Sequence, residues 1–380
     1  MNNNQEAFFA LVRAGLFPVH GEGLMVHDFS NVDWGEVYRL AEEQSVIGLV
    51  AAGIETVQGS WFKVQGSPLV PQEWALQFIG QTLQIEQRNR AMNEFVARLI
   101  ALLRKNDIYA ILVKGQGIAQ CYEKPLWRAS GDVDLLLSED NYEKAKEILF
   151  PQADSVEQEF VFLKHIGMSI SGWEVELHGT QRPRLTKQID RMVDEVQEDV
   201  FYGGHVRSWM NGKTQVFLPG PDSDVIFVFT HILHHFYQEG IGLRQICDWC
   251  RLLWTYRESL DIALLESRLR KMGLMDEWKA FYALANKYLG MPEVSGLMFQ
   301  DSRHSKWERK ADRVMVFVLE VGNFGHNRTH TQSASYIVRK AFSLWRRTAD
   351  SFRHFITFPK NSLKIWWYMV CTGVKLVRGE

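Results

Sequence analysis

The chain has 380 residues, of which 46% are hydrophobic and 23% are charged. This is the composition of a globular protein with ample apolar material for a core, and it excludes a disordered, collagen-like or coiled-coil chain. With 43 basic and 45 acidic residues the formal net charge is −2, which excludes a globally basic nucleic-acid-binding protein but leaves a local basic patch open.

Targeting features and cysteines predict a reduced, cytoplasmic protein. The N-terminus, Met1–Glu6, lacks the basic segment of a signal peptide. The apolar run Ile365–Val374 is about half as long as a membrane span, so no transmembrane segment is expected. Four cysteines are too few for a disulfide framework in a chain of this length, and Cys247 and Cys250 are predicted to be buried core residues.

The first hundred residues have helical periodicity. Asp33 is a good N-cap for a helix that we expect to end at Gly48 or Gly53. A loop is predicted over Gly59–Pro71, because glycine, proline and serine recur there. A long amphipathic helix is then predicted over Gln72–Lys105.

The pattern changes to that of strands after this helix. An apolar run, Ile108–Val113, is followed by the glycine-containing turn Lys114–Gly117. A second strand is predicted over Val133–Leu137, and Ser138 is placed to cap the helix Asp140–Phe150. Further strands are predicted over Phe160–Lys164, Gly167–Ile170, Trp173–Leu177 and Val216–Leu218, with a hairpin turn at Ser171-Gly172.

The rest of the chain is again helical, so the expected class is α+β. The predicted helices are Ser223–Glu239, Gly242–Glu258, Leu260–Met272, Asp276–Leu289, Ser305–Val321 and Ser333–Phe358, with Pro359 separating a last apolar segment. We therefore predict three parts: a helical region over residues 1–106, a small mixed-sheet core over 107–221, and a helical region over 222–380.

Two aspartates are the most informative feature of the core. Asp132 and Asp134 are two residues apart on a strand, so they point to the same face. Adjacent carboxylates repel each other unless a cation lies between them, and a divalent metal is the obvious one. The strand Trp173–Leu177 carries Glu174 and Glu176, which share a face by the same rule. If this strand lies beside the first, three carboxylates converge.

Three carboxylates around one or two metal ions suit in-line phosphoryl or nucleotidyl transfer. The turn at Lys114-Gly115 is placed to bind phosphates through its backbone N–H groups, and Lys114 and Arg128 add positive charge. The alternative is that both aspartates are solvated acids that cap the next element. Glu174 is the acid of its strand that we expect to face solvent.

Several of these residues resemble a known family. Val113-Lys114-Gly115, the run Gly131–Leu136 and Glu176-Leu177-His178 are similar to motifs of the uncharacterised bacterial nucleotidyltransferases, which belong to the DNA-polymerase-β-like superfamily. The helical stretch that runs from His234-His235 to Asp248-Trp249 is similar too. The resemblance covers roughly residues 95–251.

The resemblance implies a small mixed sheet and transfer of a nucleoside monophosphate from an NTP, with Mg²⁺ or Mn²⁺ held by Asp132, Asp134 and Glu176. The NTP and an unidentified acceptor are the expected partners. A departure from the superfamily pattern is Gln116, which stands where a serine or glycine usually follows the first glycine. The residues predicted to bind the nucleotide are Lys114, Gly115, Gln116, Arg128, His178, His235, Arg244 and Asp248.

Other polar residues allow two interpretations each. His231, His234 and His235 lie on one predicted helix and are placed either to bind a metal or phosphate or to pack. Arg244 and Asp248 are four residues apart, which predicts a pair on a helix surface or, alternatively, a buried pair at the carboxylates. His178 is either a general base beside Glu176 or a structural residue at the end of a strand.

A C-terminal segment mixes basic and aromatic residues from Arg339 to Trp367. It is interpreted as an amphipathic helix with a solvated basic face and an aromatic face toward the core, or as a binding surface for nucleic acid or an anionic membrane. The main alternative to an enzyme is a non-catalytic nucleotide-binding or protein-interaction module that retains the fold. The near-neutral charge argues against a nucleic-acid substrate without excluding one, and the oligomeric state is left open.

Overall fold

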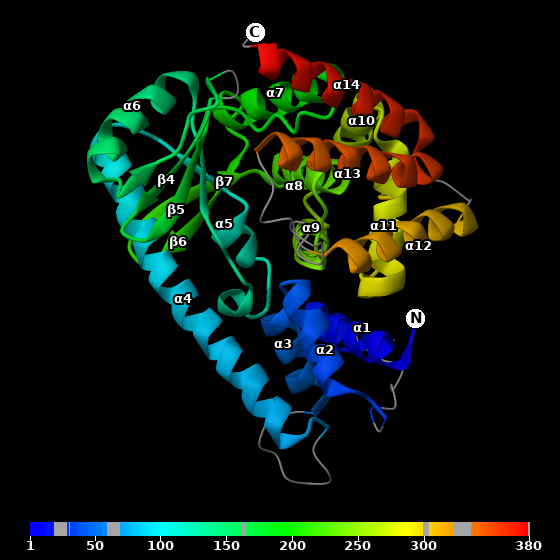
Figure 1. The fold of residues 1–380 in the computed structure, drawn as a ribbon. Coiled ribbons are helices and arrows are strands. Elements are labelled where there is room, and N and C mark those ends of the chain that lie inside the picture. Colours follow the sequence, from blue (N-terminus) through cyan, green and yellow to red (C-terminus); the bar gives the residue numbers. More distant parts are fainter. Residues whose placement is uncertain are drawn as a thin grey trace.

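One mixed sheet and a large assembly of helices make up the protein. The computed structural model describes residues 1–18, 29, 31–58, 69–161, 164–298, 304–322 and 336–378. Figure 1 shows the sheet at one side of the molecule, with helix α4 (Gln72–Lys105) running along it from the N-terminal helices α1–α3. The α+β class predicted from the sequence is confirmed.

Seven strands form the sheet, in the order β3-β4-β5-β2-β1-β7-β6. Strand β2 pairs antiparallel with β1 and parallel with β5, so the sheet is mixed at its centre. The strands are β1 (Ile111–Val113), β2 (Val133–Leu136), β3 (Ser155–Val156), β4 (His165–Ile170), β5 (Trp173–His178), β6 (Val206–Asn211) and β7 (Thr214–Pro219).

The two faces of the sheet have different neighbours because side chains alternate along each strand. Val133 and Leu135 of β2 belong to a core cluster with α4 and with helix α6 (Glu139–Leu149). Asp134 and Leu136 point to the other face, where Leu136 joins the larger helical core. This second face therefore carries the polar groups of the candidate site.

Helices occupy most of the remaining chain. Before the sheet lie α1 (Asn3–Leu16), α2 (Trp34–Glu43) and α3 (Ile47–Gln58), and within the core lie α5 (Gly115–Ala119) and α7 (Lys187–Phe201). After the sheet come α8 (Pro221–Gln238), α9 (Leu243–Tyr256), α10 (Ile262–Met272), α11 (Met275–Leu289), α12 (His304–Val321), α13 (Tyr336–Thr357) and α14 (Pro359–Arg378). Within the part of the chain described, no helix combines the length and apolar character needed to cross a membrane.

The end predicted for the helix that Asp33 caps is wrong. Helix α2, capped by Asp33 as predicted, stops at Glu43, and Gly48 and Gly53 lie inside the separate helix α3. Neither glycine ends a helix. Both instead lie where the backbone of α3 closely approaches another segment of the chain. A Cβ at Gly48 would collide with the backbone oxygen of Trp127, and one at Gly53 with that of Leu11.

Replacing Gly53 by alanine is expected to destabilise the protein by about 1–3 kcal/mol, because the added methyl group overpacks the close contact between α1 and α3. Gly80 on α4 is the matched control, since a Cβ there has open space around it. Gly80→Ala should leave the free energy of unfolding unchanged or raise it by about 0.5–1 kcal/mol. Urea unfolding of both variants checks this. A neutral Gly53→Ala would contradict the packing described.

Two other sequence predictions have mixed outcomes. The strand predicted over Phe160–Lys164 is wrong, since Phe160 makes only an isolated bridge to His165, where β4 begins. Residues 162 and 163 of that segment, like residues 59–68 of the predicted loop, lie outside the described residues. The hairpin turn is correct: Ser171 and Gly172 both have positive φ, as a two-residue turn of this kind requires.

The cysteine pair and the C-terminal proline fall where they were predicted. Cys247 and Cys250 are both fully buried in α9. Pro359 begins α14, which lies along the outside of the molecule with α13 in Figure 1. Phe352 and Trp367 on these two helices are largely exposed, at 71% and 63%. Aromatic side chains of this segment therefore lie on its outer surface.

Candidate metal and nucleotide site

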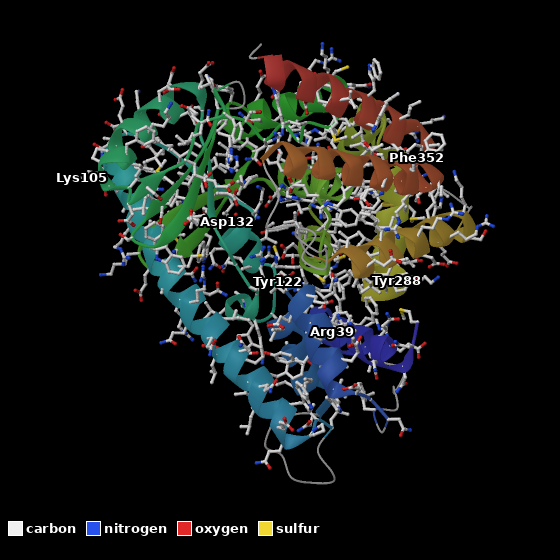
Figure 2. All side chains as sticks on the ribbon, viewed as in Figure 1. Arg39, Lys105, Tyr122, Asp132, Tyr288 and Phe352 are labelled. Atoms are coloured by element: carbon white, nitrogen blue, oxygen red, sulfur yellow. The ribbon has the colours of Figure 1, made fainter. Side chains whose placement is uncertain are left out.

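Three carboxylates meet on the polar face of the sheet. Strands β2 and β5 are parallel neighbours, and their register places Asp134 directly beside Glu176. One oxygen from each of Asp132, Asp134 and Glu176 lies within 4.8 Å of the others. Figure 2 shows Asp132 between the sheet and the helices that follow it. The arrangement offers hard oxygen ligands, which Mg²⁺ and Mn²⁺ prefer. The donor set therefore fits such an ion.

Lys114 neutralises part of this negative charge. Its Nζ lies 3.2 Å from Oδ1 of Asp134. Burial alone would lower the pKa of Lys114, but the charges of Asp134, Glu176 and Asp132 outweigh this effect and raise it. The backbone of Lys114 has φ 57° and ψ −145°, a conformation that is energetically costly for any residue other than glycine. Such strain recurs at functional sites, where the position of a group matters more than its conformational cost.

Two histidines complete the cluster on the side of Glu176. His178 Nε2 lies 2.8 Å from Oδ1 of Asp134 and 3.3 Å from Oε2 of Glu176. His165 Nε2 lies 3.2 Å from the same Oε2. Burial would lower the pKa of His178, but its bonds to the two carboxylates raise it above the ordinary value. Burial would raise the pKa of Glu176, but both histidines hold it well below its usual range.

The two aspartates have opposite pKa shifts. The negative charge of Asp134, together with burial, raises the pKa of Asp132. Burial would raise the pKa of Asp134 as well, but the charge of Lys114 and the bond from His178 lower it below the ordinary value. Asp134 is thus the better neutralised of the pair, and Asp132 is the one with more to gain from an added cation.

Arg128 is bound within the protein. Its Nε and Nη2 donate to the two carboxylate oxygens of Asp248 at 2.8 and 2.6 Å. Its Nη1 donates to Ser130 Oγ at 2.8 Å, and Tyr122 donates its hydroxyl to Asp248. The pair predicted between Arg244 and Asp248 is therefore wrong: Asp248 pairs with Arg128, 120 residues earlier in the chain.

Arg244, at the carboxylate cavity, has unused hydrogen-bonding capacity. Its Nη1 donates to the carbonyl of Ala129 at 3.0 Å, but its buried Nε has no acceptor among the described residues. Burial and repulsion from Arg128 lower its pKa. A buried guanidinium with an unpaired N–H is a ready partner for an anion.

Gln116 is directed away from the carboxylates. It is buried, and its Nε2 donates to Oδ1 of Asn89 on α4 at 3.0 Å. Asn89 in turn donates to the carbonyls of Leu126 and Arg128. Gln116 thus fastens the short helix α5 and the following segment to α4.

A cavity of about 260 Å³ covers the carboxylates, and we call it the carboxylate cavity. It lies between the polar face of the sheet and helices α8 and α9. Asp132, Asp134 and Glu176 line it together with Lys114 and Gly115. From the helices, Arg244, Asp248, His231 and His235 face it, and Arg128 forms part of its wall. Most of the residues predicted to bind the nucleotide therefore share one cavity.

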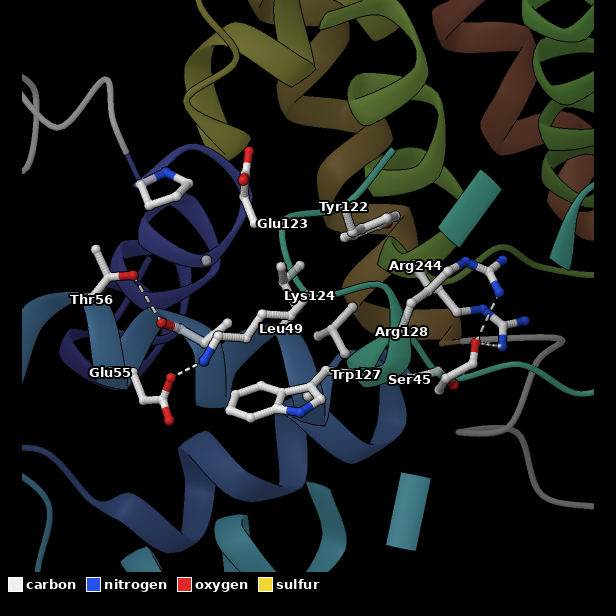
Figure 3. Close-up of a pocket in the computed structure, with 16 residues that line it drawn as sticks. Ser45, Leu49, Glu55, Thr56, Tyr122, Glu123, Lys124, Trp127, Arg128 and Arg244 are labelled. Carbon is white, nitrogen blue, oxygen red and sulfur yellow. Dashed lines mark hydrogen bonds and ion pairs between the residues drawn. The ribbon is translucent and has the colours of Figure 1, made fainter. Parts of the chain in front are cut away.

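Figure 3 shows an adjoining cavity of about 230 Å³, between α3 and the segment that carries Tyr122 and Trp127. Arg128 and Arg244 line both this cavity and the carboxylate cavity. The ammonium of Lys124 pairs with Glu55 and lies 3.7 Å from the centre of the Trp127 ring. Arg244 therefore stands at the boundary between two cavities.

A third cavity of about 300 Å³ adjoins the carboxylates on the side of Glu176, and we call it the histidine cavity. His178, His231, His234 and His235 line it with Lys114 and Glu176. His231 and His235 approach within 3.1 Å through their Nε2 atoms, and His234 Nδ1 donates to the carbonyl of Pro183 at 2.7 Å. Burial lowers the pKa of His231, and it lowers that of His234 to about 3.

Sequence reasoning missed His165, Gln181 and Arg184, which also line the histidine cavity. A signal for His165 was present, because the Ser171-Gly172 turn fixes the hairpin register and places His165 opposite His178. Gln181 and Arg184 follow β5 in an irregular segment, and no local pattern marks them.

Comparison with known proteins gives one match. The sequence profile of the uncharacterised nucleotidyltransferase family matches residues 30–290, which include the whole sheet and the helices that face it. Neither a curated protein nor a solved structure matches the chain.

Proposed function

Because the chain belongs to the uncharacterised nucleotidyltransferase family, we propose that it transfers a nucleoside monophosphate from an NTP to an acceptor and releases pyrophosphate in a metal-dependent reaction. The observation that carries this proposal is the convergence of three carboxylates beneath a cavity with a buried, incompletely bonded arginine. A cluster of acids with only a structural role needs no cavity above it. A nucleotide site needs both the acids, which bind the metal, and a cavity, which holds the nucleotide.

Asp132, Asp134 and Glu176 would hold one or two Mg²⁺ or Mn²⁺ ions. Such ions neutralise the charge that develops on the transferred phosphoryl group. Lys114 lies against the same carboxylates and is placed to bind a phosphate oxygen. His178 orients Asp134 and Glu176 through hydrogen bonds, as partners of metal-binding carboxylates commonly do.

Arg244 is proposed to bind the triphosphate from the opposite side of the cavity. Arg128, which the sequence suggested for this role, already has its charge matched by Asp248. We assign Arg128 to the cavity wall and the phosphate contact to Arg244. This leaves the cavity of Figure 3, beyond Arg244, as the space for the nucleoside.

The non-catalytic alternative loses its main support. It rested on Gln116 in place of a serine or glycine. Gln116 has a structural task, the hydrogen bond to Asn89 on α4, and it does not line the carboxylate cavity. Its presence therefore does not argue against nucleotide binding at Lys114 and Arg244.

Replacing Arg244 by glutamine is expected to weaken binding of the Mg²⁺–NTP complex about tenfold to a hundredfold, the worth of one or two charge-assisted hydrogen bonds. Isothermal titration of ATP, CTP, GTP and UTP in the presence of Mg²⁺ measures this and tests the proposed function directly. Arg90→Gln is the matched control, because Arg90 is exposed on α4 and pairs only with Glu86. Equal affinity of the Arg244→Gln variant and the wild type would contradict the assignment, and no binding of any NTP to the wild type would refute the function.

A further inference from the structure

The histidine cavity is separate from the space assigned to the triphosphate. It shares Lys114, Glu176, His231 and His235 with the carboxylate cavity, but neither Asp132 nor Arg244 lines it. Glu176 therefore stands at the junction of the two cavities. A molecule in the histidine cavity reaches the carboxylates at Glu176, whereas the charge of Arg244 acts on Asp132.

This placement matters because the proposed reaction is an in-line displacement. The attacking oxygen must approach the phosphorus opposite the leaving pyrophosphate. If Arg244 holds the triphosphate, the acceptor enters from the side of Glu176. The histidine cavity is the space in the described structure that opens on that side.

The segment from Thr180 to Arg184 forms one wall of this cavity and is held firmly in place. Arg182 donates to both carboxylate oxygens of Asp194 at 2.8 and 2.9 Å. The backbone N–H of Arg184 donates to Asp190, and its carbonyl accepts from Gln238 on α8. A wall tied to both α7 and α8 presents its side chains in fixed positions, as a binding site requires.

The lining of this cavity is rich in hydrogen-bond donors. Lys114, Arg182 and Arg184 bring three positive charges, and Glu176 and Glu239 bring two negative ones. Five histidines also line it, and two of them, His231 and His235, line the carboxylate cavity as well. The Nε2 of Gln181 is buried and has no hydrogen-bond partner among the described residues. A buried donor without an acceptor is rare in folded proteins and points to a ligand oxygen.

We propose that the histidine cavity binds the acceptor, and that the acceptor is a small hydroxyl compound that carries a phosphate monoester. This inference rests on the proposed nucleotidyltransferase function. The phosphate lies against Gln181 and Arg184, and the hydroxyl points to Glu176. The hydroxyl oxygen forms a bond to the α-phosphorus of the NTP and its proton passes to a water molecule in the cavity. The bond from the α-phosphorus to the bridging oxygen breaks, and pyrophosphate leaves with the electron pair.

Binding of inorganic phosphate to the full chain, already saturated with Mg²⁺ and α,β-methylene-ATP, tests this proposal without a known acceptor. Phosphate should bind to this complex, and Arg184→Gln should weaken its binding about tenfold to a hundredfold. Gln181→Met should weaken it also, and this variant removes an N–H that no protein group uses, so its fold is kept. Arg191→Gln on the exposed side of α7 is the matched control.

The outcomes separate this inference from the proposed function. If α,β-methylene-ATP fails to bind, the proposed function fails. If it binds but phosphate does not, or if phosphate binds equally to the wild type and the Arg184→Gln variant, the acceptor assignment is overturned. Competition identifies the source of the phosphate group: ribose 5-phosphate should displace phosphate. Displacement by a 5′-phosphorylated RNA alone would overturn the small-molecule assignment.

Discussion

Replacing Asp134 by asparagine is expected to lower the rate of nucleotidyl transfer by at least about a hundredfold to a thousandfold. Asparagine keeps the shape of the side chain but removes the charge that, in the proposed function, would hold a metal ion between β2 and β5. Metal ions supply several kcal/mol of transition-state stabilisation in such reactions, and each 1.4 kcal/mol is a factor of ten in rate. The carboxylate of Asp134 also pairs with the side chains of Lys114 and His178, so its charge positions both of them.

Pyrophosphate release from a Mg²⁺–NTP complex measures this loss, and titration with Mn²⁺ followed by paramagnetic resonance shows whether metal binding falls with it. Glu174→Gln is the matched control, because Glu174 lies on the same strand and face as Glu176 but is exposed and does not belong to the carboxylate cluster. The control should retain full activity. An Asp134→Asn variant that releases pyrophosphate at the wild-type rate would remove the metal site from the mechanism.

Replacing Asp248 by alanine is expected to destabilise the protein by about 3–5 kcal/mol. The change leaves the guanidinium of Arg128 buried without its partner, and an unpaired buried charge is costly. It also removes the acceptor of the Tyr122 hydroxyl. Because Arg128 and Asp248 join the sheet to α9, the loss should appear in global unfolding rather than in one helix.

Urea unfolding followed by circular dichroism measures this effect. Removing both charges together, as Arg128→Met with Asp248→Leu, should recover most of the lost stability, since apolar pairs often replace buried ion pairs without loss. Arg39→Ala on the exposed surface of α2 should cost less than about 1 kcal/mol. A small effect of Asp248→Ala would show that Arg128 finds water or another partner.

The centre of the site could be predicted because it follows from local rules. Asp132 and Asp134 share a face through the two-residue repeat of a strand, and the Ser171-Gly172 turn fixes which residues of the hairpin lie opposite each other. On the face that Glu174 and Glu176 share, Glu176 is the acid that joins the cluster and Glu174 is the exposed one, as expected. What these rules do not give is the neighbour of β2, which the structure shows to be β5.

The partners of the surrounding polar groups could not be predicted, because they are distant in the chain. Arg244 and Asp248 have the spacing of a helical pair, yet Asp248 binds Arg128, which lies far away in the chain. Gln116 lies next to the phosphate turn but bonds to Asn89 on α4. In both cases tertiary contacts outweigh the local pattern, and only the assembled fold decides which charge is left for a ligand.

Helix α7 and strand β6 were both missed, for different reasons. Helix α7 has buried residues at Ile189, Val193, Val196 and Val200, a helical spacing that was readable in the sequence. Strand β6, Val206–Asn211, is an edge strand with no fully buried residue, so it carries little apolar signal. The segment from Thr180 to Arg184, which lines the histidine cavity, is held by hydrogen bonds to α7. Because α7 was not predicted, the residues of this segment were not recognised as part of a site.

The most direct measurement of the central claim follows the two ends of the triphosphate separately. The protein is incubated with Mg²⁺, a panel of sugar phosphates and NTPs labelled with ³²P at either the α- or the γ-phosphorus. The account predicts that the α-label enters a product while the γ-label is released as pyrophosphate, and that Asp134→Asn abolishes both. Transfer of the γ-label to an acceptor, with the α-label left in the nucleoside diphosphate, would contradict it.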